Sequence, residues 1–179
     1  GVEKVYCAPG NAGTAVDGEN VNIAVDDLGR LMSFAKHNDI DLTVVGPEVP
    51  LVAGIVDEFN SHGLKIFGPT KAAARLEGSK AFSKEIIKKA GVPTATSKSF
   101  TRLEEAHAYL EALESTVDDT VEHVPIVVKA DGLAAGKGVH VCRNCTEGKA
   151  AATQMLQDGL FGKAGQTIVI EEFLEGQEA

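Results

Sequence analysis

The sequence predicts an α/β protein, with a parallel sheet in its first part and a second domain built around a strand–loop–strand hairpin. In the first 70 residues, three short apolar segments are each followed by a loop rich in glycine and proline, and mostly by a helix. This alternation is typical of a parallel sheet. Further along, a glycine-rich loop separates two apolar segments within residues 127–142. We therefore expect two domains, at residues 1–78 and 79–179.

In the first domain, alternating and continuous apolar runs predict strands at residues 2–8, 42–45 and 65–67, and a short strand at 21–25. The run at 42–45 is apolar throughout, which is typical of a strand buried on both faces. Helical periodicity predicts helices at 27–38, with an aspartate cap, and at 51–62, closed by Gly63. In such sheets ligands bind at the carboxyl ends of the strands. The loops that follow the strands, at residues 9–14, 46–50 and 68–70, are therefore candidate binding loops.

In the second domain, we expect helices at residues 79–90, 102–114 and 146–156, and a strand at 167–171. Ser79 is a suitable N-cap for the first helix, which Gly91 and Pro93 would stop. Residues 115–123 are polar and acidic without periodicity, so we interpret them as a surface connector.

Composition excludes several classes of function. The chain has 17 basic and 26 acidic residues, a net charge of −9, and few aromatic residues, which argues against nucleic-acid binding. No apolar run approaches the ~18 residues of a membrane span, and no secretory leader is visible, so we expect a cytoplasmic protein without a membrane partner. Because the chain lacks an initiator Met and stops without a closing element, we also expect it to be an excerpt of a longer protein.

The hairpin at residues 127–139 has the parts of a flap that closes over a polyphosphate. Lys129 ends the first apolar strand, and Lys137 lies in the loop among three glycines, Gly132, Gly136 and Gly138. Glycine lets the backbone approach a ligand and aim its N–H groups, while lysines supply charge for phosphate oxygens. A Walker A loop has four residues between its glycines and a Ser or Thr after the lysine, and this loop has neither. The alternative is a glycine-rich hairpin without a ligand.

Other candidate positions each allow two interpretations. Lys129, if it faces the interior of a sheet, needs an anionic partner, or else it has reached solvent at a strand end. Lys80 lies in the first turn of a helix, where a bound anion would offset its unfavourable interaction with the helix dipole, or where it is simply exposed. The carboxylate-rich end of the strand at 167–171 is either a nucleotide-binding edge or a solvated strand end. The loop at 9–14 is either a phosphate-binding nest or a simple turn.

The cysteines Cys142 and Cys145 form a C-x-x-C pair, which could serve a metal or redox role. No second such pair exists in the chain, whereas a zinc site usually needs four ligands. The alternative is a strand cysteine and a turn cysteine in a reducing compartment.

Taken together, six segments resemble the phosphoribosylamine–glycine ligases (glycinamide ribonucleotide synthetases) of purine biosynthesis, in the order in which they occur in that family. The segments lie at residues 8–15, 44–56, 66–70, 76–82, 127–138 (VVKADGLAAGKG) and 168–174 (IVIEEFL). The resemblance implies a Rossmann-like domain followed by the first part of an ATP-grasp domain. It also implies an enzyme that joins glycine to 5-phosphoribosylamine through glycyl phosphate, consuming ATP with Mg²⁺ and giving glycinamide ribonucleotide, ADP and phosphate.

By motif, the resemblance implies that two lysines contact the ATP phosphates, that the glycine-rich loop covers them, and that the segment after the last strand holds the adenine and ribose. Glu171 would approach the adenine amine, the backbone of Glu172 and Leu174 would hold the adenine edge, and Glu178 would reach the ribose. The implied ATP-binding residues are Lys80, Lys129, Asp131, Gly132, Gly136, Lys137, Gly138, Glu171, Glu172, Phe173, Leu174 and Glu178.

The resemblance also places two loops at the phosphoribosylamine site. Their residues are Gly10, Asn11, Gly13, Thr14, Gly46, Pro47 and Glu48. The opening strand and Gly-Gly-Arg-Glu-His loop of the family are absent, and its magnesium ligands are expected beyond residue 179. The segment alone is therefore expected to be inactive, without a catalytic residue or metal ligand of its own. Eukaryotic members of the family are often fused to further enzymatic domains, so the resemblance allows such a fusion here.

Three alternatives compete with this interpretation. The chain could belong to another ATP-grasp ligase that acts on a different carboxylate, such as a relative of biotin carboxylase, or to a nucleotide-binding module without catalysis. The loops at 9–14 and 46–50 fit the purine ligase better. A dinucleotide oxidoreductase is disfavoured because two residues separate Gly10 from Gly13, and the G-x-G-x-x-G fingerprint is missing.

Overall fold

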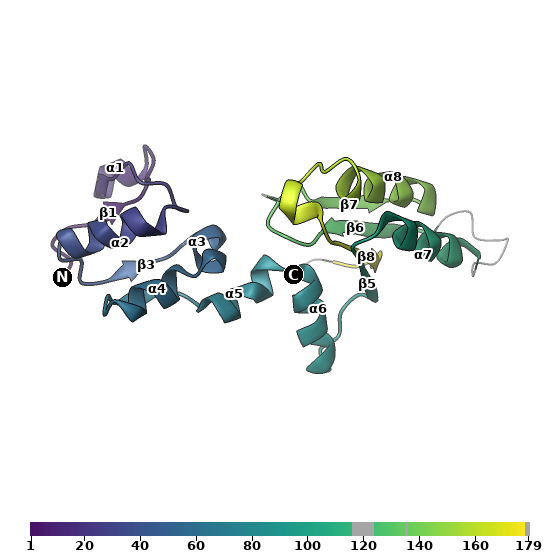
Figure 1. Cartoon of the computed structure of the whole chain (residues 1–179), viewed down its shortest axis with the longest axis horizontal. Helices are drawn as coiled ribbons and strands as arrows, with labels where there is room; N and C mark the ends of the chain where they lie inside the picture. Colours follow the sequence, from purple (N-terminus) through teal and green to yellow (C-terminus); the bar gives the residue numbers. More distant parts are fainter. Residues whose placement is uncertain (116–123, 135, 178–179) are drawn as a thin grey trace. The chain divides into compact units, whose positions relative to one another are not determined.

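The computed structural model describes residues 1–115, 124–134 and 136–177. Contacts divide the chain into two compact units, Gly1–Arg75 and Leu76–Ala179 (Figure 1). The division falls inside helix α5 (Lys71–Gly78), close to the domain boundary expected after residue 78. Within the described part of the chain, no helix is both long and apolar enough to cross a membrane.

The first unit contains two pairs of parallel strands, each strand only two residues long. Strand β1 pairs with β2, and β3 pairs with β4, so the predicted parallel arrangement is confirmed. The elements in chain order are β1 (Tyr6–Cys7), α1 (Thr14–Asp17), β2 (Glu19–Asn20), α2 (Leu28–His37), β3 (Thr43–Val44), α3 (Glu48–Ala53), α4 (Ile55–Ser61), β4 (Ile66–Phe67) and α5.

Three predictions for this unit need correction. The strand expected at 21–25 lies instead at Glu19–Asn20, because these residues are the ones in register with β1. The strand near residue 43 is not buried on both faces, since Val44 is 66% exposed. The helix expected at 51–62 is two helices, because Gly54 adopts a left-handed conformation (φ 102°) that ends α3 and begins α4.

The core of the first unit is small. Helix α2, capped by Asp27 as predicted, packs Ala35 against Ile55, Val56 and Phe59 of α4. Partly buried residues surround this cluster, and several large apolar side chains of the unit stay exposed, Phe67 of β4 among them.

The second unit is built on one antiparallel sheet of four strands in the order β5-β8-β6-β7. The predicted hairpin is confirmed, because its two strands, β6 and β7, pair antiparallel, and the three predicted helices are present within two residues of their expected ends. Helices α1 and α5 and strand β5 were not predicted from the sequence. The elements are α6 (Lys80–Lys89), β5 (Ser97–Phe100), α7 (Leu103–Ser115), β6 (Ile126–Ala130), β7 (Val139–Cys142), α8 (Cys145–Leu156), η1 (Gly162–Gly165) and β8 (Ile168–Glu172). The predicted connector at 115–123 lies almost wholly outside the described residues.

The two faces of this sheet differ. Helices α7 and α8 lie beside the sheet (Figure 1). On the face toward these helices, alternate residues of β6 and β8, such as Val128 and Ile170, join Leu110 of α7 and Met155 of α8 in a fully buried core. Because side chains alternate along a strand, the residues between them point to the opposite face. Those residues include Lys129 and Glu171, and helix α6 packs near them, beside β5 and β8. The sheet thus separates an apolar core from a second face, the polar face, which carries these two charged side chains beside the buried Val127 and Val169.

Candidate functional site

The polar face of the sheet contains a partly buried ion pair. Lys129 and Glu171 are diagonal neighbours on β6 and β8, and Lys129 Nζ lies 2.9 Å from Glu171 Oε2. Glu171 is only 5% exposed. Burying a carboxylate is costly unless it is paired and hydrogen-bonded. The anionic partner that the sequence required for an inward-facing Lys129 is therefore Glu171.

The N-terminus of helix α6 is capped by a carboxylate from the flap. The Asp131 carboxylate accepts hydrogen bonds from the Ser79 hydroxyl (3.0 Å) and from the backbone N–H of Ala81 (2.7 Å). Ser79 also caps the helix, as predicted, by accepting from Phe82 N–H. An anion at the helix N-terminus is favourable because it accepts hydrogen bonds from free N–H groups and interacts favourably with the positive end of the helix dipole. Asp131 thus fixes the start of α6 to the base of the flap.

Lys80, the first residue of α6, also contacts the base of the flap. Its ammonium donates to the backbone carbonyl of Gly132 at 3.2 Å. Burial lowers the pKa of Lys80; the charge of Lys129 acts in the same direction, and that of Asp131 opposes it. Two ammonium groups from separate segments therefore lie close enough to repel each other, and an anionic ligand between them would relieve that repulsion.

The glycines of the flap have two different roles. At its base, Gly132 donates its N–H to the Ala164 carbonyl, and a Cβ there would lie 2.9 Å from Ala164 Cα. Gly138 is equally confined, because a Cβ would lie 2.6 Å from that of Ala134. Gly136 has open space around it but a φ of 76°, which favours glycine. Lys137 beside it is exposed.

The segment after β8 is held by the residues before β5. The Glu172 carboxylate accepts from Thr96 N–H at 2.7 Å, and Glu172 N–H donates to the Thr96 carbonyl at 3.0 Å. This anchor lies at the end of the strand, directly before Phe173 and Leu174, which are 38% and 62% exposed. Glu178, predicted to reach a ribose, lies outside the described residues.

The two loops predicted to face phosphoribosylamine lie in the first unit. In the first loop, the Asn11 side chain accepts from the N–H groups of Gly13 (2.7 Å) and Thr14 (3.1 Å), and the Thr14 hydroxyl lies 2.7 Å from Asn20 Oδ1. Gly10 has a φ of 74° and is packed against Asn20. The N–H groups of Gly13 and Thr14, which a phosphate nest would offer, are thus already hydrogen-bonded within the loop.

The second loop surrounds the start of α3. Pro47 is the N-cap residue of α3, and Glu48 provides a negative charge in its first turn, while Gly46, Pro47 and Glu48 are all exposed. This loop follows β3, so it lies at the carboxyl end of that strand, as expected.

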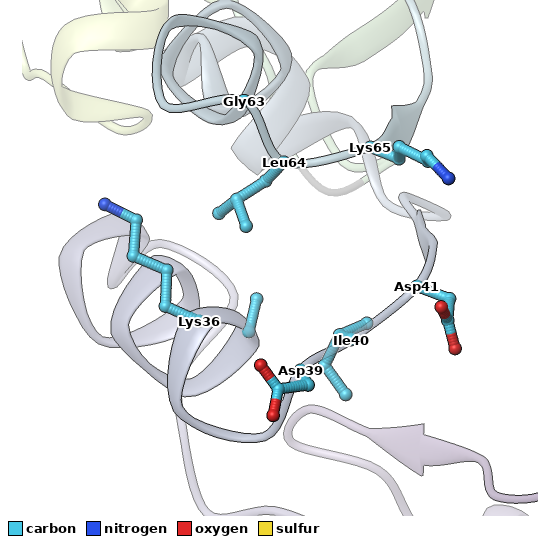
Figure 2. Close-up of a pocket in the computed structure, with 8 residues that line it drawn as sticks. Lys36, Asp39, Ile40, Asp41, Gly63, Leu64 and Lys65 are labelled. Carbon is cyan, nitrogen blue, oxygen red and sulfur yellow. The ribbon is translucent and has the colours of Figure 1, made fainter.

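A shallow hollow of about 350 Å³ opens in the first unit, away from every predicted site residue (Figure 2). Its lining comes from the segments that precede β3 and β4, which places it at the amino ends of these strands. Figure 2 shows that the lining mixes two lysines with two aspartates and a few apolar side chains: Ala35, Lys36, Asp39, Ile40, Asp41, Gly63, Leu64 and Lys65. Its balanced charge does not mark it as an anion site.

The C-x-x-C pair is part of the core. Cys142 and Cys145 are free, and both are almost fully buried. Burial raises the pKa of each thiol, which keeps it protonated and unreactive. Among the residues that the structure describes, no group of three or more His, Cys, Asp or Glu side chains gathers to hold a metal ion.

Lys84 is the residue at this site that the sequence analysis missed. Its ammonium lies 3.4 Å from Glu171 Oε2, on the same carboxylate oxygen that Lys129 contacts. The spacing of the two lysines could have indicated Lys84, because residues four apart share one face of a helix and Lys84 lies four residues after Lys80.

Comparisons with known proteins agree with the resemblance noted in the sequence. The family model for the N domain of phosphoribosylglycinamide synthetase matches residues 1–77, and that for its ATP-grasp (A) domain matches residues 78–179. The chain is 55% identical to the phosphoribosylamine–glycine ligase of Pasteurella multocida and 53% identical to that of Escherichia coli K12. Each alignment covers 99% of this chain but only 40% of the relative.

Solved structures support the same fold. The crystal structure of phosphoribosylamine–glycine ligase from Thermotoga maritima matches with a TM-score of 0.70 and 30% identity, over 97% of this chain and 39% of that one. The biotin carboxylase domain of the Hydrogenobacter thermophilus 2-oxoglutarate carboxylase, solved with MgADP, matches at 0.65 and 21% identity over 88% and 34% of the two chains, a likeness of fold alone. The predicted fold class, a parallel-sheet domain followed by part of an ATP-grasp domain, is confirmed.

Proposed function

This chain belongs to the phosphoribosylglycinamide synthetase family, and we propose that it forms the part of a phosphoribosylamine–glycine ligase that grips the phosphates of ATP. The complete enzyme would join glycine to 5-phosphoribosylamine, giving glycinamide ribonucleotide, ADP and phosphate. The chain spans 40% of the curated relatives, so the remaining parts of the centre would lie in the rest of such a protein. We expect the enzyme to act in the cytoplasm.

One observation carries this proposal: ammonium groups from two separate segments converge beside a glycine-rich flap. Lys80 begins α6 and Lys129 lies on β6, yet the charge of Lys129 helps to lower the pKa of Lys80, and Lys80 contacts the flap backbone directly. A triphosphate carries several negative charges, which such a cluster neutralises. The polar face of the sheet, free of the packing by α7 and α8, is where that charge would lie.

In the proposed reaction, this chain positions ATP while the glycine carboxylate attacks its γ-phosphate to form glycyl phosphate, from which the amine of phosphoribosylamine displaces phosphate. Lys80 and Lys129 would bind phosphate oxygens and stabilise the charge that is transferred. The flap, residues 131–138 with Lys137, would cover the phosphates and exclude water. Magnesium would neutralise further phosphate charge, held by ligands expected in the rest of the protein.

The adenine would lie at the end of β8. We propose that Glu171 approaches the adenine amine, that the backbone of Glu172 and Leu174 forms the adenine-binding edge beside Phe173, and that Glu178 reaches the ribose. The Thr96 contacts of Glu172 support this assignment, because they fix the position of that edge. The loops Gly10–Thr14 and Gly46–Glu48 are proposed to face 5-phosphoribosylamine.

The direct test is phosphate release by the full-length protein. We expect release only when ATP, magnesium, glycine and phosphoribosylamine are all present, and we expect Lys129→Ala to abolish it. The control is Lys89→Ala, which removes an exposed lysine from the same helix as Lys80 and should leave the rate unchanged. Binding of Mg–ATP without turnover would indicate a nucleotide-binding module instead. Turnover by residues 1–179 alone would show that the magnesium ligands do not lie beyond residue 179, contrary to our expectation.

A further inference from the structure

The carboxylate of Glu171 lies beside two ammonium groups, although a single ammonium group would be enough to neutralise its charge. Lys129 Nζ lies 2.9 Å and Lys84 Nζ 3.4 Å from the same oxygen, Oε2, of a side chain that is only 6% exposed. Two ammonium groups beside one carboxylate leave an excess of positive charge that suits an incoming anion.

The two lysines are held very differently. The Lys84 ammonium also donates to Thr94 Oγ1 at 2.7 Å and to the Ala95 carbonyl at 3.1 Å. An ammonium has three donor protons, so these two acceptors engage two of them, while the charge of Lys84 lies 3.4 Å from Glu171 Oε2. In the described part of the chain, the acceptor that the structure gives to Lys129 Nζ is Glu171, which leaves Lys129 two donor protons. Lys129 is also the more exposed side chain, at 26% against 17%.

We propose that Lys84 is a positioning residue that remains on Glu171 as a fixed counter-ion, so that Lys129 can transfer its hydrogen bonds to a nucleotide phosphate. This inference rests on the proposed function and adds a residue to it. Lys84 itself does not contact the nucleotide, and it acts through the charge of Glu171.

The physical reason is the cost of an unpaired buried charge. Removing one partner of a buried ion pair is strongly destabilising, because the other charge is left uncompensated. Without Lys84, any movement of Lys129 toward a phosphate would leave Glu171 in that state. Lys129 would then be retained on Glu171, and the nucleotide would lose a ligand.

The test compares Mg–ATP affinity in variants of the full-length protein by calorimetry, with the melting temperature measured alongside. We expect Lys84→Met to weaken binding about tenfold, Lys84→Arg to restore most of the affinity because it keeps the charge, and Lys89→Met to change it less than about twofold. In turnover, the KM for ATP should rise more than kcat falls, since the loss is in binding.

A second set of variants separates positioning from direct contact and remains informative if Lys84→Met fails to fold. In a Glu171→Gln background there is no buried charge to compensate, so adding Lys84→Met should change the affinity less than about twofold. A tenfold loss that persists in this background would overturn the proposal, as would wild-type affinity in Lys84→Met itself. A wild-type protein that binds no Mg–ATP would instead refute the proposed function.

Discussion

The two units hold their candidate sites in opposite ways. In the second unit, residues far apart in sequence fix one another: Asp131 caps α6, Lys129 pairs with Glu171, and Glu172 is bound to Thr96. In the first unit, the loop around Asn11 is held by its own hydrogen bonds and by Asn20, nine residues away. The geometry of the proposed phosphate site therefore depends on the tertiary fold, whereas the geometry of the first loop is largely local.

The two units also differ in their cores. The largest effect that we expect is the loss of stability when a core side chain of the second unit is truncated. Leu110 is fully buried against the sheet, so Leu110→Ala should destabilise the second unit by about 2–5 kcal/mol. Val44 of the first unit is 66% exposed, and Val44→Ala should change stability by less than about 0.5 kcal/mol. Hydrogen exchange, read separately for the amides of each unit, measures both. Similar effects at the two positions would remove the distinction between the cores.

A smaller loss of stability is expected when the hydrogen bonds that hold each candidate site are removed, and it should spread further in the second unit than in the first. Asp131→Ala removes a cap that joins α6 to the flap, and should cost about 1–2 kcal/mol while increasing exchange in the first turn of α6 and at the base of the flap together. Asn11→Ala should cost about 0.5–1 kcal/mol and affect only its own loop. If Asp131→Ala left exchange at the flap base unchanged, the proposed coupling between flap and helix would be wrong.

The smallest expected difference between the two units is in the reactivity of their cysteines. Cys7 in the first unit is half-buried, whereas burial raises the pKa of Cys142 and Cys145 in the second. Protonation of these two thiols favours the fold, and that contribution is complete below the ordinary thiol pKa and lost as the pH rises through the raised one. At neutral pH we expect iodoacetamide to label Cys7 first and the other two only after unfolding, as mass spectrometry would show. Early labelling of Cys142 would contradict its burial.

Local signals in the sequence predicted most of the second unit. The Ser79 cap, the apolar strands around the glycine-rich loop and the helical periodicity of α7 and α8 each depend on neighbouring residues, and all are present in the structure. Strand β5 was missed because Ser97–Phe100 is a short edge strand with little apolar pattern, and it is defined by its pairing with β8.

The site was predicted as a set of residues but not as a set of contacts. Lys80, Lys129 and Glu171 could be singled out from their motifs, yet nothing in the sequence indicated that Asp131 supplies the anion at the start of α6. In the first unit, the apolar periodicity around Gly54 predicted one helix, but this glycine adopts a left-handed conformation that ends α3 and begins α4.

The central claim, that lysines from two segments grip one triphosphate, is tested most directly by calorimetric titration of the full-length protein with Mg–ATP. Losing a charged hydrogen bond of about 1.5–3 kcal/mol should weaken binding roughly 10- to 100-fold in Lys80→Met and again in Lys129→Met, while Lys89→Met binds like the wild type. Equal affinity in all four proteins would contradict the account.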